Sequence, residues 1–100
     1  GDRPQRVVVV SIPDWGVTRF GRHSGRDAAK VGRELDLYNA ANAEIAASLH
    51  VRYAHVTPAS RDGGDHADML VGDGLHPSAA MYARWLVTIE PQARAALSTP

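Results

Sequence analysis

The hydrophobic pattern begins with an uninterrupted run of β-branched residues. Four valines from Val7 to Val10 are followed by Ser11 and Ile12, and the run stops at Pro13. A short continuous apolar run of this kind is typical of a strand buried on both faces, as in a parallel sheet, whereas a solvent-facing antiparallel strand would alternate. The pattern therefore predicts a central parallel strand over residues 7–12.

Residues 28–49 show a helical pattern, with apolar positions recurring at spacings of three, four and seven. Asp27 precedes the pattern and is expected to cap the helix. Asn39 and Asn42 are weaker helix formers within it. The predicted apolar stripe of this helix consists of Val31, Leu35, Tyr38, Ile45 and Leu49.

A second strand and a second helix follow. Residues 51–57 predict a strand that ends at Pro58, and residues 59–75 predict a loop rich in Asp and Gly. Pro77 is expected to open the second helix at its first position, which suits proline. Pro91 is expected to kink or restart that helix, because its ring removes an interior hydrogen bond. The predicted apolar stripe consists of Met81, Tyr82, Trp85, Leu86 and Ile89.

The order strand, helix, strand, helix predicts a parallel α/β unit with a right-handed crossover. Two strands alone would leave both as sheet edges, although residues 7–12 have the pattern of a central strand. We therefore expect the chain to form part of a larger α/β sheet. The long loops 13–27 and 58–76 both leave carboxyl ends of strands, so we expect them to lie on one side of the sheet and share one site.

Composition narrows the classes of function. The chain has 100 residues, 44% hydrophobic and 22% charged, which fits one small folded domain. The formal charge is zero, so no basic excess points to nucleic acid. The longest apolar run is far shorter than the ~20 residues of a membrane span. The absence of Cys excludes disulfides and thiolate chemistry within these residues, and is compatible with secretion or with the cytoplasm.

The segment Asp73-Gly74-Leu75-His76-Pro77 carries the clearest chemistry. A carboxylate and an imidazole three residues apart can hydrogen-bond at Nδ1, which fixes the tautomer and leaves Nε2 free as a general base. A following helix N-terminus disfavours an imidazolium, and the carboxylate would offset that field. The alternative is a surface Asp-Gly turn with an imidazole that caps the helix.

The same segment, continued through Ser78 to Trp85, resembles the last conserved block of the SGNH hydrolases, also called GDSL-type esterases and lipases. Residues 8–16, 38–42 and 56–61 are similar to other parts of that family in the same order, so the resemblance covers nearly the whole chain. It implies a flavodoxin-like three-layer α/β/α fold with a parallel sheet. Residues 1–100 would then be the C-terminal βαβα part of a single SGNH hydrolase domain.

The resemblance also implies a Ser-His-Asp carboxylic ester hydrolase, with Asp73 as the orienting acid, His76 as the general base, and neither metal nor organic cofactor. None of the six serines lies in Gly-Asp-Ser or Gly-x-Ser-x-Gly. We expect the chain alone to be inactive, since losing the serine costs ~10⁶-fold in a well-studied hydrolase. The expected partners are an ester substrate and an N-terminal half, on the same or a separate chain.

Other residues leave alternatives open. Trp15 and Phe20 either line the acyl or alcohol pocket at its rim or anchor the long loop. Ser60 and Arg61 are expected to form a turn at the strand end, with Arg61 paired to a carboxylate. The acidic segment 62–68 has a spacing that fits neither a calcium loop nor a zinc helix, so we expect it to be solvated.

A second hypothesis assigns no catalysis to the chain. It would be a fragment or a complementing module that pairs through its exposed strand edge with a polypeptide carrying the Gly-Asp-Ser half. The same edge could instead support self-association, for example as a domain-swapped dimer.

Overall fold

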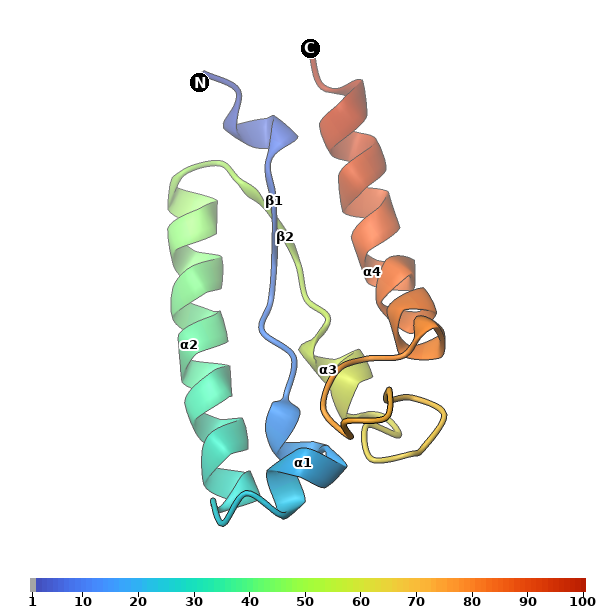
Figure 1. The fold of residues 1–100 in the computed structure, drawn as a ribbon. Coiled ribbons are helices and arrows are strands. Elements are labelled where there is room, and N and C mark those ends of the chain that lie inside the picture. Colours follow the sequence, from blue (N-terminus) through green and yellow to red (C-terminus); the bar gives the residue numbers. More distant parts are fainter. Residues whose placement is uncertain (1) are drawn as a thin grey trace.

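The structure, a computed structural model, describes residues 2–100 and has a mixed α/β architecture (Figure 1). The main elements are β1 (Val8–Val10), α2 (Ala28–Ser48), β2 (Arg52–Ala54) and α4 (Ala79–Ser98). Shorter elements are the 3-10 turns η1 (Pro4–Arg6) and η2 (Trp15–Val17) and the helices α1 (Arg19–Arg22) and α3 (Thr57–Arg61).

The two strands pair in parallel, with Val9 opposite Tyr53, and α2 forms the crossover between them. Figure 1 shows α2 and α4 on opposite sides of the strands, so the chain has three layers. The predicted order of strands and helices and the parallel pairing are confirmed. Both chain ends lie at one end of the molecule, and α1 and α3 lie at the other, beyond the carboxyl ends of the strands.

Both strands are shorter than predicted. Val7 and Val10 are 49% and 41% exposed, because no strand among residues 2–100 lies along the open edge of β1. Within residues 2–100, β2 is the one strand that pairs with β1, and the other edge of β1 is open. Thr57 does not end a strand but begins α3, because Val56 adopts a helical backbone and Pro58 suits the first turn. The predicted loop 59–75 therefore starts with the end of a helix.

The helix boundaries follow local capping. Asp27 caps α2 as predicted, and its carboxylate accepts hydrogen bonds from the backbone of Ala29 and Lys30. The second helix starts later than predicted, because Ser78 is its cap and Pro77 lies just before it. Pro91 lies inside α4, which continues as one helix to Ser98, so the predicted restart does not occur.

The predicted apolar stripes are wider than the buried faces. In α2, Tyr38, Ile45 and Leu49 are 57–65% exposed, and in α4 Tyr82 and Leu86 are half exposed. Only one edge of each stripe packs on the sheet. The buried residues are Val31, Leu35, Asn39 and Ala46 in α2, and Met81, Trp85 and Ala96 in α4.

Asn39, in the middle of α2, is buried. Its side-chain amide forms the pair of hydrogen bonds with the Ile12 backbone that a neighbouring strand would otherwise form. Its Oδ1 accepts from the backbone N–H of Ile12 (2.8 Å), and its Nδ2 donates to the Ile12 carbonyl (3.1 Å) and to Thr57 Oγ1 (2.9 Å). Ser11 Oγ in turn accepts from the backbone N–H groups of Val56 and Thr57. This network joins α2 to the chain segments that leave both strands.

Replacing Asn39 by Leu keeps the volume but removes three hydrogen bonds and leaves the Ile12 N–H without a partner, while the Ile12 carbonyl keeps its bond from Thr57 Oγ1. We predict a loss of about 2–4 kcal/mol in the free energy of unfolding, since each buried unsatisfied group costs ~1–3 kcal/mol. Urea unfolding measures this. The matched control Asn42→Ala, on the exposed side of the same helix, should be neutral or slightly stabilising. Equal effects of the two substitutions would contradict the role of the Asn39 amide.

Candidate functional site

The two long loops meet beyond the carboxyl ends of the strands, as the topology predicted. The backbone N–H of Phe20 donates to the Gly74 carbonyl (3.1 Å), and Arg22 forms an ion pair with Asp65 (2.6 Å). Both contacts join the loop after β1 to the loop after β2. The loops therefore enclose one shared site.

Asp14 anchors the first loop. Its buried carboxylate accepts from the Gly16 backbone N–H and from Arg61 Nε, both at 2.9 Å. Arg61 Nη2 also binds Asp36 on α2 (2.9 Å), which confirms the predicted pairing of Arg61 with a carboxylate. The hydrogen bond to Asp14 raises the pKa of Arg61, so the guanidinium remains charged.

Ser60 has a structural role in the same region. Its Oγ donates to the Thr57 carbonyl (2.6 Å) and accepts from the Asp14 backbone N–H (2.9 Å). The side chain is buried and its only proton is used, so it is not available as a nucleophile. This agrees with the structural role expected from the sequence.

Residues 69–78 close on themselves and hold the Asp73 to His76 turn at their tip. The Ser78 N–H donates to the Met69 carbonyl, and the Val71 N–H donates to the His76 carbonyl, both at 2.9 Å. Met69 is buried in the core. Its core neighbours are Val56, Met81 and Trp85. The turn is therefore tied at its base to the packed part of the chain.

Asp73 and His76 are in direct contact through Oδ2 and Nδ1. The other oxygen, Oδ1, accepts from the backbone N–H groups of Leu75 (2.8 Å) and His76 (3.0 Å). The hydrogen bond from the His76 side chain, followed by the two backbone bonds, lowers the pKa of Asp73 from 3.8 to about 2. An ionised carboxylate only accepts, so Nδ1 carries a proton, and in the neutral imidazole Nε2 is the nitrogen with the lone pair.

The backbone conformation favours glycine at position 74. Its φ of 71° lies in the left-handed region, which side chains rarely adopt. A Cβ there would also stand 2.8 Å from Arg19 Nε, so the flexible Arg19 side chain would have to move. Gly74 thus allows the sharp turn that brings the carboxylate of Asp73 back to the imidazole.

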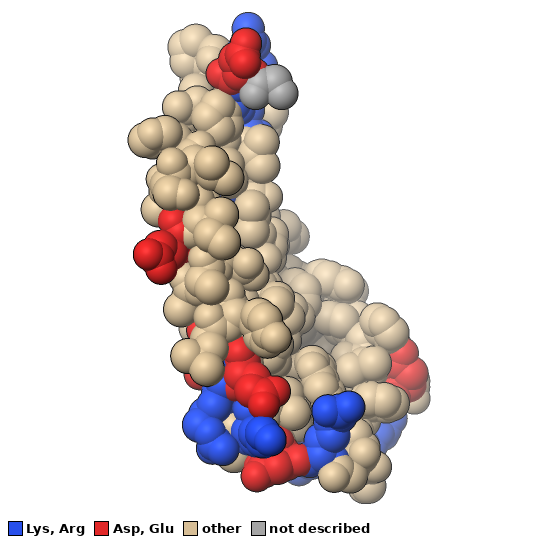
Figure 2. Space-filling view, turned by 90° about the vertical axis from the view of Figure 1, so that its left-hand side faces the viewer, with Lys and Arg blue, Asp and Glu red and all other residues tan. Residues whose placement is uncertain are grey.

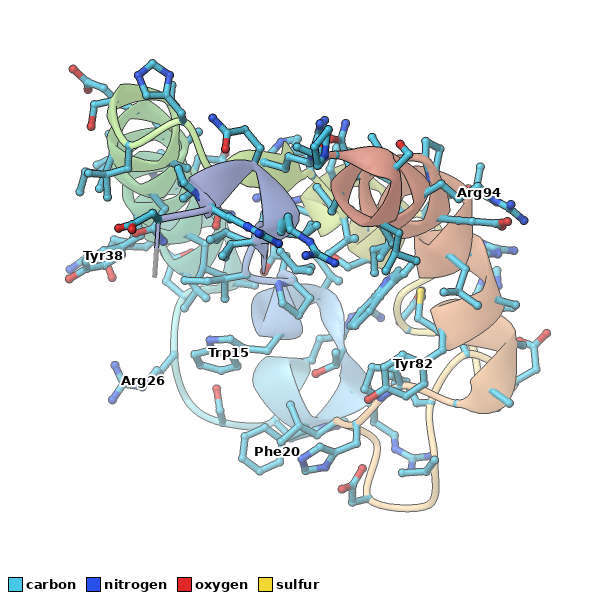
Figure 3. All side chains as sticks on the ribbon, turned by 90° about the horizontal axis from the view of Figure 1, so that it is seen from above. Trp15, Phe20, Arg26, Tyr38, Tyr82 and Arg94 are labelled. Carbon is cyan, nitrogen blue, oxygen red and sulfur yellow. The ribbon has the colours of Figure 1, made fainter. Side chains whose placement is uncertain are left out.

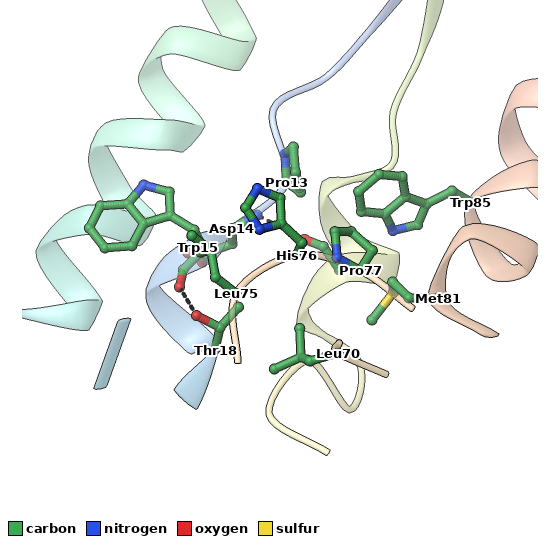
Figure 4. Close-up of a pocket in the computed structure, with 12 residues that line it drawn as sticks. Pro13, Asp14, Trp15, Thr18, Leu70, Leu75, His76, Pro77, Met81 and Trp85 are labelled. Atoms are coloured by element: carbon green, nitrogen blue, oxygen red, sulfur yellow. Dashed lines mark hydrogen bonds between the residues drawn. The ribbon is translucent and has the colours of Figure 1, made fainter. Parts of the chain in front are cut away.

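His76 lies at the edge of an apolar pocket (Figure 4). The imidazole is 69% exposed, and no hydrogen bond to its Nε2 is found among residues 2–100. The pocket has a volume of about 250 Å³. Its apolar walls are formed by Pro13, Trp15, Leu70, Leu75, Pro77, Met81 and Trp85.

The two aromatic residues proposed for the pocket have different positions. Trp15 lines the pocket, whereas Phe20 is not among its lining residues and is half exposed. The Phe20 ring packs edge-on against Trp15, with 6.5 Å between ring centroids. Phe20 therefore supports Trp15 and, through its backbone bond to Gly74, fixes the two loops together.

Sequence reasoning missed Asp14 as the anchor of the site. A signal was present, because a carboxylate directly after the strand and two residues before Gly16 is the pattern of an Asx turn. The buried Trp85 Nε1, which has no hydrogen-bond partner among the described residues, carried no such signal. An orphaned indole depends on tertiary packing that a single sequence does not reveal.

No group of three His, Cys, Asp or Glu side chains within residues 2–100 is placed to hold a metal ion. In the acidic segment, Asp65 pairs with Arg22, and Asp62 Oδ2 lies 3.5 Å from Arg84 Nη1. Of the helices in this part of the chain, none is long and apolar enough to cross a membrane.

Comparison of the chain with models of protein families, with curated proteins and with solved structures finds no match.

The substitution His76→Ala tests the contact in the turn. It removes the largest cause of the shift, so the pKa of Asp73 should rise from about 2 toward 3.8. Because the pKa is lowered on folding, the bonds to ionised Asp73 are complete above about pH 4 and are lost as pH falls through about 2. NMR titration of the Asp73 carboxyl carbon measures this. The control His66→Ala, in the same loop, should leave the pKa unchanged, and an unchanged value in both variants would refute the contact.

Proposed function

We propose that this chain supplies the acid–base pair of a Ser-His-Asp carboxylic ester hydrolase of the SGNH type. One observation carries the proposal: the Asp73 carboxylate holds His76 Nδ1, while Nε2 remains free beside an apolar pocket at the carboxyl ends of parallel strands. Such a position is where open α/β sheets bind their ligands. The sequence resemblance of residues 73–85 to the last block of the family supports the same assignment.

In the proposed reaction, His76 Nε2 accepts the proton of a serine hydroxyl as its oxygen attacks the ester carbonyl. The imidazolium then gives this proton to the leaving alcohol as the ester C–O bond breaks, which forms the acyl-enzyme. Water then gives a proton to the same nitrogen as it attacks the acyl group. The imidazolium returns this proton to the serine oxygen as the acyl C–O bond breaks, which releases the acid. Asp73 keeps the imidazole oriented and stabilises its charged form, which the nearby N-terminus of α4 disfavours.

The serine in this proposal comes from another segment. Ser60 is committed to the Thr57 carbonyl, and the Ser78 hydroxyl donates to the Asp68 carbonyl (2.6 Å). The open edge of β1 is the place for that segment, because a strand paired in parallel with β1 ends on the same side as His76. Val7, Val10 and Ile12, which are 38–49% exposed, would be covered by it.

Exposed apolar residues of α2 also favour a covering segment. Val31, Tyr38 and Ile45 are seven residues apart and share one flank of α2. Val31 lies against Gly16, which follows β1, whereas Tyr38 and Ile45 are 65% and 57% exposed. Figure 3 shows Tyr38 on the outside of α2, and Figure 2 shows that the helix exposes a mostly uncharged surface above the charged end of the molecule.

The overall dimensions also indicate uncovered surface. The radius of gyration is 14.9 Å, whereas about 13 Å is usual for 100 residues. The accessible surface is 6382 Å², compared with about 5,500 Å² for a compact monomer of this mass. Further strands and helices against β1 and α2 would remove this excess.

The open β1 edge also favours a second candidate function, a complementing module that binds the serine-bearing half without contributing catalysis. Self-association through the same edge would not bring two active-site halves together. A two-fold axis would pair β1 with its copy in antiparallel fashion, so the two His76 side chains would lie at opposite ends of the sheet.

Fluorophosphonate labelling of the natural preparation, read by native and then denaturing mass spectrometry, tests the proposal. We predict label on a serine outside residues 1–100, carried by a polypeptide that binds this chain or is continuous with it. Labelling should fall on the order of 10⁶-fold with His76→Ala and about 10⁴-fold with Asp73→Asn. The control His66→Ala should label normally.

Two other labelling outcomes would contradict the proposed catalytic role. Label on a bound polypeptide that is unaffected by His76→Ala would reject the catalytic role and support the complementing module. Label on Ser60 or Ser24 of this chain would contradict both candidates, because neither serine is expected to be activated.

A further inference from the structure

The pocket beside His76 is small. Its volume of about 250 Å³ corresponds to roughly eight non-hydrogen atoms at ~30 Å³ each. A long acyl chain or a disaccharide exceeds this space. The size alone therefore limits what part of an ester the pocket can hold.

Apart from His76 Nε2 at the rim, the polar side chains that line the pocket are already used within the chain. Thr18 Oγ1 donates to the Trp15 carbonyl (2.6 Å) and accepts from the Gly21 N–H (3.0 Å). Asp14 is held by Gly16 and Arg61, as described above. The orphaned Trp85 Nε1 is buried, so it adds no polar surface to the wall. A ligand hydroxyl in the pocket would consequently lose its hydrogen bonds to water without replacement.

The walls are also fixed in place. Met81 and Trp85 are 2% and 9% exposed and belong to the core that α4 forms. Pro13 and Pro77 have a restricted backbone φ. Figure 4 shows Pro77 and Met81 on one side of the space below the His76 ring and Leu75 on the other, with Leu70 beneath it. The pocket is therefore formed before a ligand arrives.

We infer that this pocket binds the apolar acyl or alcohol group of a small ester, a chain or ring of about eight non-hydrogen atoms. The ester carbonyl would lie at the rim, within reach of His76 Nε2. The inference rests on the proposed function for the reaction at that carbonyl, but the binding of the apolar group depends on the pocket alone.

A series of 2-alkanones from four to twelve carbons tests the inference, since a ketone presents a carbonyl that is not hydrolysed. Trp15 and Trp85 are the two tryptophans of the chain and both line the pocket, so intrinsic fluorescence reports binding. Affinity should rise about fourfold per methylene, the equivalent of ~0.8 kcal/mol, until the chain reaches about eight non-hydrogen atoms, and then level off. Glucose, as a polar probe, should not bind.

Substitutions at Leu75 should change the ketone length at which affinity levels off. Leu75→Phe narrows the pocket and should shorten the longest favourable ketone, whereas Leu75→Ala should lengthen it by one or two carbons. The control Leu86→Ala removes a half-exposed leucine of α4 that is not among the pocket-lining residues, and should change nothing. Affinity that rises without a limit, or that Leu86→Ala weakens equally, would overturn the inference.

Asp73→Asn separates this inference from the proposed function, because Asp73 is not among the pocket-lining residues. It should keep ketone binding within about twofold while lowering fluorophosphonate labelling of the serine about 10⁴-fold. Labelling that depends on Asp73, without length-limited ketone binding, would reject the pocket and retain the hydrolase. Ketone binding with labelling that is indifferent to Asp73 would retain the pocket and reject the hydrolase.

Discussion

The side-chain amide of Asn39 is the interaction on which the rest of the molecule depends. It pairs with both backbone groups of Ile12, where the chain has left β1 and no strand accompanies it. The same amide binds Thr57, where the chain has left β2. Both loops therefore start from one fixed point beneath α2. A buried amide that is fully hydrogen-bonded gives this junction a single geometry, which hydrophobic contacts alone would not specify.

The position of His76 follows from that junction. The loop after β1 leads from this junction to Asp14, which is hydrogen-bonded to Arg61 of α3. The loop after β2 leads to residues 69–78, which backbone hydrogen bonds close and which contain His76. The imidazole is thus supported by a chain of short polar contacts, although it is itself exposed. Its partner Asp73 stays ionised at neutral pH because three hydrogen bonds favour the charged form. An exposed imidazole with a fixed orientation would suit the proposed site, which a second surface completes.

Sequence reasoning predicted the features that local chemistry determines. The valine run before Pro13, the cap at Asp27, and the pairing of Asp73 with His76 each depend on a few neighbouring residues. The burial of Asn39 was not predicted, because hydrophobic periodicity assigns only apolar residues to the buried face of a helix, and an amide is not counted among them. The exposure of Tyr38 and Ile45 was missed for a related reason: spacing shows that a helix has an apolar flank, but not which elements cover it. The helix was predicted to open at Pro77 because proline suits the first helical position, and the cap at Ser78 was not predicted.

The central claim is that Asp73 fixes His76 with its proton on Nδ1 and its lone pair on Nε2. Long-range ¹H–¹⁵N NMR of the imidazole, recorded where His76 is neutral, measures this tautomer directly and needs no substrate or nucleophile. The account predicts a protonated Nδ1 and an unprotonated Nε2 in the chain. A neutral His76 that carries its proton on Nε2, or that exchanges between both forms, would contradict the account, because no base would then be available to a serine.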